Sequence, residues 1–194
     1  ANGGAVYNAG SFYATTSNFE SNSATVSGGA INTASGSITS ISNSLVWKND
    51  AEQNGGAISS SGSITLRNAT IAGNSATNGG GLYTAGTANI YNTIVAGNAA
   101  TTGADLVSTK AANMVNSLLG SKDGVKVAPT MTNSKVGAAG FVVAPVFEGK
   151  QLMNPDEVNL ALRSDSVAIN SGNDALALDA TGKQVLELDY FGSA

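Results

Sequence analysis

The chain of 194 residues contains no cysteine and no histidine. These two absences exclude disulfides, thiol nucleophiles, Ser-His-Asp triads and most zinc sites. Charged residues make up 11% of the chain, with 9 Lys+Arg against 13 Asp+Glu, so the net charge is −4. Such a chain cannot assemble the basic stripe that phosphate binding requires, and we expect no nucleic-acid partner. There is also no apolar run of 18 residues, so we expect no direct insertion into a membrane.

Small polar residues are abundant instead: 24 Gly, 23 Ser, 21 Asn and 17 Thr. They recur in phase, which is the signature of a repeat architecture. Gly-Gly pairs, each followed by a small and then an aliphatic residue, occur at Gly3-Gly4, Gly28-Gly29, Gly55-Gly56 and Gly79-Gly80. Gly followed by Ser or Thr occurs at Gly10-Ser11, Gly36-Ser37, Gly62-Ser63 and Gly86-Thr87. A third marker is an apolar residue three positions before Asn22, Asn49, Asn74 and Asn98. All three markers recur with the same spacing. The repeat is therefore about 25 residues long.

The repeat predicts an all-β fold. Within one copy, Ile64 and Leu66 alternate with polar residues, which indicates a short strand with one buried side. We expect three strands and three corners per copy, stacked as a right-handed parallel β-helix with an irregular C-terminal capping region. Val6, Ile31, Ile58 and Leu82 should form one inward ladder. Phe19, Val46, Ile71 and Val95 should form another.

Glycine and asparagine mark the corners. The Gly pairs (Gly3, Gly4, Gly28, Gly29, Gly55, Gly56, Gly79, Gly80) are interpreted as structural turns, because glycine tolerates left-handed backbone. The column Asn22, Asn49, Asn74 and Asn98 has two interpretations. It could form a structural ladder of stacked amides, which we favour, or a polar ligand row on the surface.

The second half differs in composition. Residues 1–120 are predicted to hold the repeats, with a weaker fifth start at Gly103 and a closing strand over 116–120. Residues 121–194, in the same domain, should form an irregular excursion, with a strand near 140–143, a further rung over 159–172 and a cap. Whether 121–150 caps the β-helix or projects from it stays open. Since the chain opens within a repeat motif and shows no initiator Met or signal peptide, we expect a fragment of a longer protein.

These motifs resemble two bacterial groups. Gly28-Gly29-Ala30-Ile31, with Phe19 three residues before Asn22, resembles the repeats of chlamydial polymorphic outer-membrane proteins. The stretch from Ala144-Pro145-Val146-Phe147 to Ser164–Gly172 resembles the ending of the "choice-of-anchor" β-helix group, although Ala144, Asp165, Val167 and Asn170 depart from its pattern. The resemblance implies display at the bacterial cell surface, adhesion or contact with polysaccharide.

Several candidate sites also have structural explanations. Lys48, Asp50 and Glu52 should form a solvated charged corner rather than a catalytic cluster, so no catalytic residue and no metal ligand is predicted. No cofactor is expected, except that Asp174, Asp179 and Asp189 could collect Ca²⁺. Tyr7, Tyr13, Tyr83 and Tyr91 could stack on sugars, but core packing or corner filling is the favoured explanation. Ser166, in Asp165-Ser166-Val167, matches a bacterial O-glycosylation signal. An ice-binding face is disfavoured because only Thr39 and Thr65 would align.

The predicted function is a non-catalytic adhesion or scaffold segment of a bacterial secreted or cell-surface protein, on the outer-membrane exterior. A glycan or a surface protein would be its partner, and it would form part of a larger polypeptide or assembly. The alternative is a polysaccharide-degrading module, a lyase or a glycosidase, because parallel β-helices also carry such enzymes.

Overall fold

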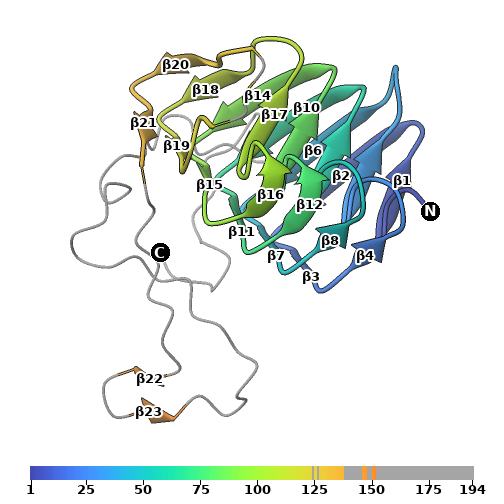
Figure 1. The fold of residues 1–194 in the computed structure, drawn as a ribbon, viewed down its shortest axis with the longest axis horizontal. Helices are drawn as coiled ribbons and strands as arrows, with labels where there is room; N and C mark the ends of the chain where they lie inside the picture. Colours follow the sequence, from blue (N-terminus) through green and yellow to red (C-terminus); the bar gives the residue numbers. More distant parts are fainter. Residues whose placement is uncertain (124, 126, 138–145, 148–149, 152–194) are drawn as a thin grey trace.

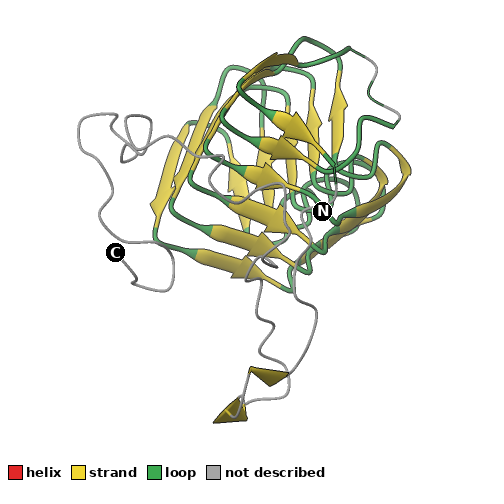
Figure 2. Ribbon diagram, turned by 90° about the vertical axis from the view of Figure 1, so that its left-hand side faces the viewer, coloured by secondary structure: helices red, strands yellow, loops and turns green. Residues whose placement is uncertain are grey.

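The structure is a computed structural model that describes residues 1–123, 125 and 127–137, with the backbone of 146–147 and 150–151 (Figure 1). Within these residues all regular structure is β-strand and no helix is present, as Figure 2 shows. The strands form four stacked parallel sheets, which the chain visits in turn before it begins the next layer. The predicted parallel β-solenoid is therefore confirmed.

The first two sheets contain the strands that follow each Gly-Gly pair. Sheet 1 comprises β1 (Val6–Asn8), β5 (Ile31–Thr33), β9 (Ile58–Ser60), β13 (Leu82–Thr84) and β17 (Leu106–Ser108). Sheet 2 comprises β2 (Ser11–Thr15), β6 (Ile38–Ser42), β10 (Ser63–Arg67), β14 (Thr87–Tyr91), β18 (Asn113–Val115) and β20 (Thr130–Thr132).

The other two sheets complete each turn. Sheet 3 comprises β3 (Asn18–Glu20), β7 (Leu45–Trp47), β11 (Thr70–Ala72), β15 (Ile94–Val95), β19 (Leu118–Leu119) and β21 (Lys135–Val136). Sheet 4 comprises β4 (Ser23–Ala24), β8 (Asp50–Ala51), β12 (Ser75–Asn78) and β16 (Ala99–Thr102). A separate antiparallel pair joins β22 (Val146–Phe147) to β23 (Lys150–Gln151).

Both predicted apolar ladders are present. Val6, Ile31, Ile58 and Leu82 are in register across sheet 1, and Leu106 extends this ladder by one turn. Phe19, Val46, Ile71 and Val95 are in register across sheet 3, and Leu119 extends that one. The interior residues of these ladders are buried in one core cluster, so stacking supplies the burial that a single repeat could not.

The two glycines of each pair have different roles. Gly55 has a φ of 65°, which L-residues adopt only with strain. Gly56 instead lies against the next turn, where an added Cβ would come within 2.4 Å of the Gly80 carbonyl oxygen. The first glycine therefore makes the turn, and the second lets two layers approach.

Three features of the fold differ from the prediction. Each of the first four turns has four strands instead of three, one in each sheet. The extra strand was not predicted because β4 and β8 have only two residues and leave no alternation to detect. Parallel pairing also continues past residue 120, since β20 pairs with β18 and β21 pairs with β19. The predicted strand at 140–143 and rung at 159–172 lie outside the described residues.

The third difference concerns Thr39. Thr65 is in register with Ser40, whereas Thr39 is in register with the inward-facing Ile64. Thr39 is buried and lies 2.7 Å, Oγ1 to Oγ1, from Thr33. The connection between β5 and β6 is two residues longer than the corresponding connection between β9 and β10, so the Gly36-Ser37 marker is out of phase. The proposed alignment of Thr39 with Thr65 was therefore wrong.

Candidate functional site

The asparagine column forms a continuous hydrogen-bonded ladder at the corner between sheets 3 and 4, hereafter the amide ladder (Asn22, Asn49, Asn74, Asn98). In each step, the backbone N–H and the side-chain Nδ2 of one asparagine both donate to Oδ1 of the next. For Asn49 and Asn74 both donor–acceptor distances are 2.9 Å. Nδ2 of Asn74 also donates to the carbonyls of Val46 and Ala72, at 2.9 and 2.8 Å. Asn49 and Asn74 are buried, so these amides hold the turns together.

Asp105 ends the amide ladder. Its Oδ1 accepts from the backbone N of Asn98 at 3.0 Å and from Nδ2 at 2.9 Å. The side chain is buried, and this desolvation raises the pKa of the Asp105 carboxyl, although hydrogen bonds from Asn98 and the Ser121 backbone oppose the shift. The repeat spacing does not reveal Asp105 as part of the column, because this residue lies only seven residues beyond Asn98.

A second column at the corner between sheets 2 and 3 was also missed, hereafter the hydroxyl column (Ser17, Ser44, Thr93, Ser117, Ser134). Each hydroxyl donates to the carbonyl two residues earlier, as Ser117 does to Val115 at 2.9 Å. Each of the last four also accepts a backbone N–H from the turn before, as Ser117 does from Thr93 at 3.1 Å. Ala69 interrupts the column. The sequence signal of this column is a Ser or Thr that recurs once per turn at the same corner.

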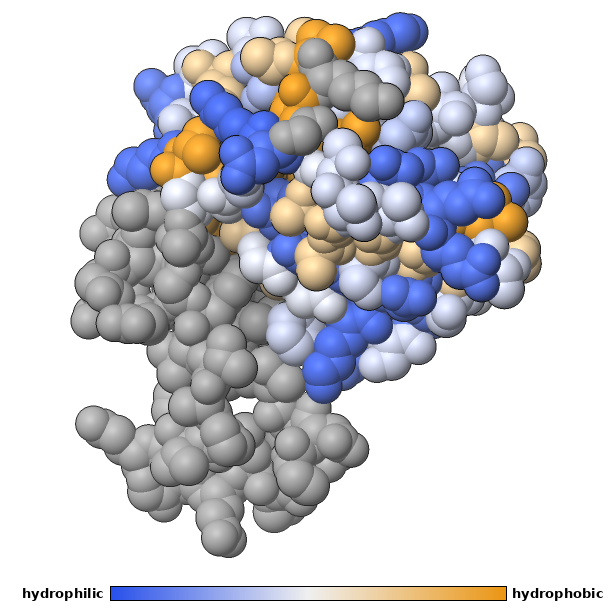
Figure 3. Space-filling view, viewed as in Figure 1, coloured by the Kyte–Doolittle hydropathy of each residue, from blue (hydrophilic) through white to orange (hydrophobic). Residues whose placement is uncertain are grey.

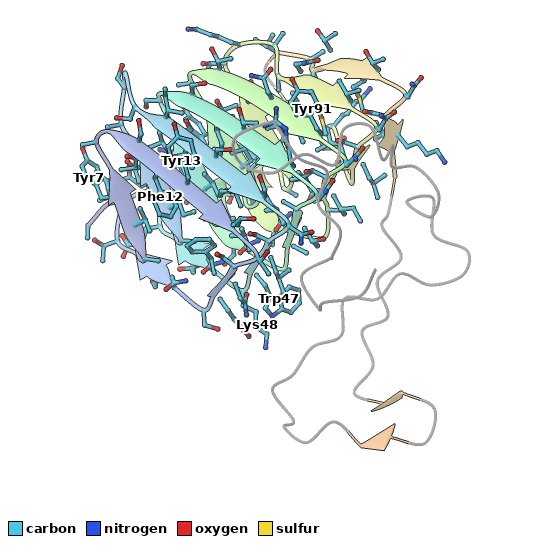
Figure 4. The ribbon with its side chains drawn as sticks, turned by 180° about the vertical axis from the view of Figure 1, so that it is seen from behind. Tyr7, Phe12, Tyr13, Trp47, Lys48 and Tyr91 are labelled. Carbon is cyan, nitrogen blue, oxygen red and sulfur yellow. The ribbon has the colours of Figure 1, made fainter. Side chains whose placement is uncertain are left out.

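The four repeat-region tyrosines point outward. Tyr7 and Tyr13 are 57% exposed, and Tyr83 and Tyr91 are half-buried. The favoured explanation, core packing or corner filling, is therefore wrong for Tyr7 and Tyr13. Figure 4 shows both on the N-terminal turn, with Tyr91 several strands away. Tyr13 lies on β2 and Tyr91 on β14, so both belong to the outer face of sheet 2.

The outer face of sheet 2 is built from two neighbouring columns of mostly uncharged polar side chains. One is Tyr13, Ser40, Thr65, Asn89, Asn113 and Thr130, and the other is Thr15, Ser42, Arg67, Tyr91, Val115 and Thr132. The Arg67 guanidinium lies 4.9 Å from the centroid of the Tyr91 ring, a cation–π distance. The hydroxyls of Ser40 and Ser42 are buried and have no hydrogen-bond partner. This face thus combines aromatic rings, one cation and many hydroxyl and amide groups.

The charged corner projects into solvent as predicted. Lys48, Asp50 and Glu52 are all exposed. Lys48 Nζ lies 5.6 Å from the centroid of the Trp47 ring, and the two side chains appear together in Figure 4. Asp50 Oδ1 accepts a hydrogen bond from the Ser75 hydroxyl. Within the described residues, no group of three Asp or Glu side chains is arranged to hold a metal ion.

The face seen in Figure 3, over β4, β8, β12 and β16, is mainly hydrophilic or neutral, with scattered hydrophobic residues. In the described part of the chain there is no helix of the length and hydropathy needed to cross a membrane. The glycosylation candidate Ser166 and the three candidate Ca²⁺ ligands, Asp174, Asp179 and Asp189, lie outside the described residues.

Comparison with known proteins finds no matching family model, no matching curated protein and no matching solved structure.

Proposed function

We propose that this β-solenoid is a non-catalytic adhesion or scaffold segment of a bacterial secreted or cell-surface protein, and that it contacts glycans through the outer face of sheet 2. One observation carries the proposal: Tyr13 and the Arg67–Tyr91 pair lie on one face among side chains that are mostly hydroxyls and amides. Aromatic faces stack on the apolar side of sugar rings, while hydroxyls and amides match sugar hydroxyls.

The geometry favours many weak contacts over one deep site. Neighbouring strands of a sheet lie about 4.8 Å apart, so Tyr13 and Tyr91, three strands apart, are separated by about 14 Å across the sheet. A polymeric ligand can contact both rings at once, and linked contacts raise the overall affinity well above that of either contact. Arg67 would favour glycans that carry an acidic group.

The test is incubation of the purified chain with a polysaccharide panel, followed by measurement of both retention and new reducing or unsaturated ends. We expect retention without cleavage. Tyr13→Ala and Tyr91→Ala should each weaken binding by about 0.5–1.5 kcal/mol, the usual contribution of an aromatic contact. Tyr7→Ala is the matched control, since Tyr7 is equally exposed but lies on sheet 1.

The other outcomes separate the alternatives. Cleavage of any polysaccharide would contradict the proposal and support a polysaccharide-degrading module, with Lys48, Asp50 and Glu52 as the first residues to replace. Equal losses in Tyr7→Ala and Tyr13→Ala would contradict the assignment to sheet 2. Absence of retention would leave a spacer or a protein-binding scaffold and remove glycan contact from the proposal.

A further inference from the structure

Four side chains form a compact block on the two middle strands of sheet 2, β10 and β14, hereafter the Arg67 block (Thr65, Arg67, Asn89, Tyr91). Thr65 is in register with Asn89, and Arg67 is in register with Tyr91. Leu66 and Ile90, which separate these residues along the strands, belong to the core cluster. Because successive residues of a strand alternate, the block lies on the outer face of the sheet.

The Arg67 block combines four different chemical groups over the area of one sugar unit. Neighbouring strands lie about 4.8 Å apart, and residues two apart on one strand are separated by about 7 Å. Within this area Thr65 provides a hydroxyl, Asn89 an amide, Tyr91 an aromatic ring and Arg67 a cation. All four side chains are half-buried, so each is anchored in the face and still in contact with solvent.

The charge of Arg67 is not balanced on its own face. The described strands of sheet 2 contain no Asp or Glu, and Arg67 is their single charged residue. Its guanidinium lies 4.9 Å from the centroid of the Tyr91 ring, on the side of the molecule shown in Figure 4. This cation–π contact holds the guanidinium in place but does not neutralise it. A planar guanidinium without an acidic partner is suited to bind carboxylate or sulfate oxygens.

The other cation–aromatic pair of the described chain provides a contrast. Lys48 Nζ lies 5.6 Å from the centroid of the Trp47 ring, but Lys48 belongs to the exposed charged corner with Asp50 and Glu52. Two carboxylates therefore lie close in sequence to this ammonium, whereas none lies on the strands around Arg67. The two cations differ in their surroundings, and only that of Arg67 favours an anionic ligand.

We propose that the Arg67 block binds one acidic sugar unit of a glycan. The Arg67 guanidinium donates to the carboxylate or sulfate oxygens of the sugar, Tyr91 contacts the apolar side of its ring, and Thr65 and Asn89 bond to its hydroxyls. This inference rests on the proposed glycan contact of sheet 2 and adds the class of sugar that is recognised. The chain has a net charge of −4, so general attraction cannot account for retention of a polyanion.

The first test measures the binding of the full chain to two pairs of polysaccharides that differ in charge: polygalacturonate with its methyl ester, and dextran sulfate with dextran. We expect at least one acidic polymer to bind about ten-fold or more tightly than its neutral counterpart, the ratio for one charge-assisted hydrogen bond. A preference in the first pair alone assigns a carboxylate, and a preference in the second pair alone assigns a sulfate. Equal binding within both pairs would overturn the inference.

The second test assigns the preference to Arg67. Arg67→Gln is compared with Lys48→Gln, which removes the same charge beside the other aromatic ring, after urea unfolding has shown that both variants are folded. We expect Arg67→Gln to lose about ten-fold in affinity for the acidic polymer and to bind the neutral one as before, while Lys48→Gln keeps the preference. Equal losses in the two variants, or an equal loss of the neutral polymer in Arg67→Gln, would overturn the inference.

The two proposals fail in different ways. Binding of neutral and acidic polymers alike would overturn the acidic-sugar site and leave the glycan contact of sheet 2 in place. Absence of binding to every polymer would overturn both.

Discussion

At both corners that flank sheet 3, side chains form hydrogen bonds to the backbone of their own turn and of a neighbouring turn. The side chains are amides at one corner and hydroxyls at the other. At both corners a side chain donates to the carbonyl two residues earlier and accepts a backbone N–H from the turn before. In the amide ladder, however, the side chain also donates onward to the next turn, as Asn74 does to Oδ1 of Asn98 at 2.9 Å. The amide ladder therefore links neighbouring turns by three side-chain bonds, two into Oδ1 and one from Nδ2 to a carbonyl of the turn before, as from Asn74 to Val46. The hydroxyl column links its turns by one such bond, and by two at Ser117.

The difference also appears in how the columns tolerate interruption. The hydroxyl column contains Ala69 and still continues on both sides of it. The amide ladder has an asparagine in every turn from Asn22 to Asn98 and ends at a buried carboxylate rather than at an apolar residue. We infer that a missing amide costs the fold more than a missing hydroxyl.

The largest expected effect tests this comparison directly. Asn74→Ala should lower the free energy of unfolding by about 3 kcal/mol, because it leaves the buried backbone N–H and Nδ2 of Asn49 without their acceptor. Ser117→Ala is the matched variant at the other corner and should cost about 1 kcal/mol, since only the Thr93 N–H loses its acceptor. Urea unfolding of both variants measures the difference. Equal costs would mean that the two corners contribute alike.

A smaller effect is expected at Gly73, which precedes Asn74 in the same corner. Gly73 has a φ of 63°, and an added Cβ would come within 2.4 Å of the Trp47 ring. Gly73→Ala should therefore cost about 2 kcal/mol in backbone strain and displaced ring. It should also shift the emission of Trp47, the chain's single tryptophan.

Gly36→Ala is the control for Gly73, because its φ is 79° but nothing lies within 4 Å of the added Cβ. It should carry the strain alone and leave the Trp47 emission unchanged. If both variants lost the same stability and neither shifted the emission, the contact between Trp47 and Gly73 would have no energetic role.

The end of the amide ladder should respond to pH. Burial raises the pKa of the Asp105 carboxyl in the folded state above its unfolded value of about 3.9. The folded state then binds more protons in the window between the two values, so stability falls as pH rises through that window and is constant above it. Asp105→Asn should remove this dependence.

The measurement is the free energy of unfolding of both chains between pH 3 and pH 8. Asp50→Asn, at an exposed carboxylate, is the matched control for the change in net charge. A slope that is identical in Asp105→Asn and in the parent chain would contradict a burial-driven pKa shift.

The smallest expected effect is a gain. Ala69→Ser should complete the hydroxyl column by accepting the Ser44 N–H, as Thr93 accepts the Ala69 N–H at 3.3 Å. We expect about 0.5–1 kcal/mol of added stability, the net contribution of one hydrogen bond, measured as a higher urea midpoint. Ala88→Ser, buried in the core cluster, should lose stability instead. A loss in both variants would show that position 69 has no room for a hydroxyl.

The sequence predicted the solenoid and both apolar ladders because each depends on residues that recur at a constant spacing. Asn22, Asn49, Asn74 and Asn98 were found for the same reason. The hydroxyl column was missed because serine, alanine and threonine share its position, so no single letter recurs. Asp105 was missed because a residue from the following turn occupies the ladder at a sequence distance unlike the repeat.

The burial of the outward residues Leu45 and Leu118 on sheet 3 did leave a signal in the sequence. Leu45-Val46-Trp47 and Leu118-Leu119 are runs of adjacent apolar residues rather than alternating ones. Such runs are typical of strands that are buried on both faces. The exposure of Tyr7 and Tyr13, by contrast, could not be predicted, since tyrosine suits the interior and the surface about equally.

Because the turns stack in register, the length of the solenoid along its axis depends directly on the number of turns. Each added repeat advances the axis by one strand spacing, about 4.8 Å, while the chemistry of every face is repeated or altered one row at a time. The length of a contact surface along the axis can therefore change only in steps of one turn. Only the addition of whole turns would lengthen the contact surface for a larger partner. An insertion shorter than a turn is accommodated in the connection between two strands, as the longer connection between β5 and β6 shows.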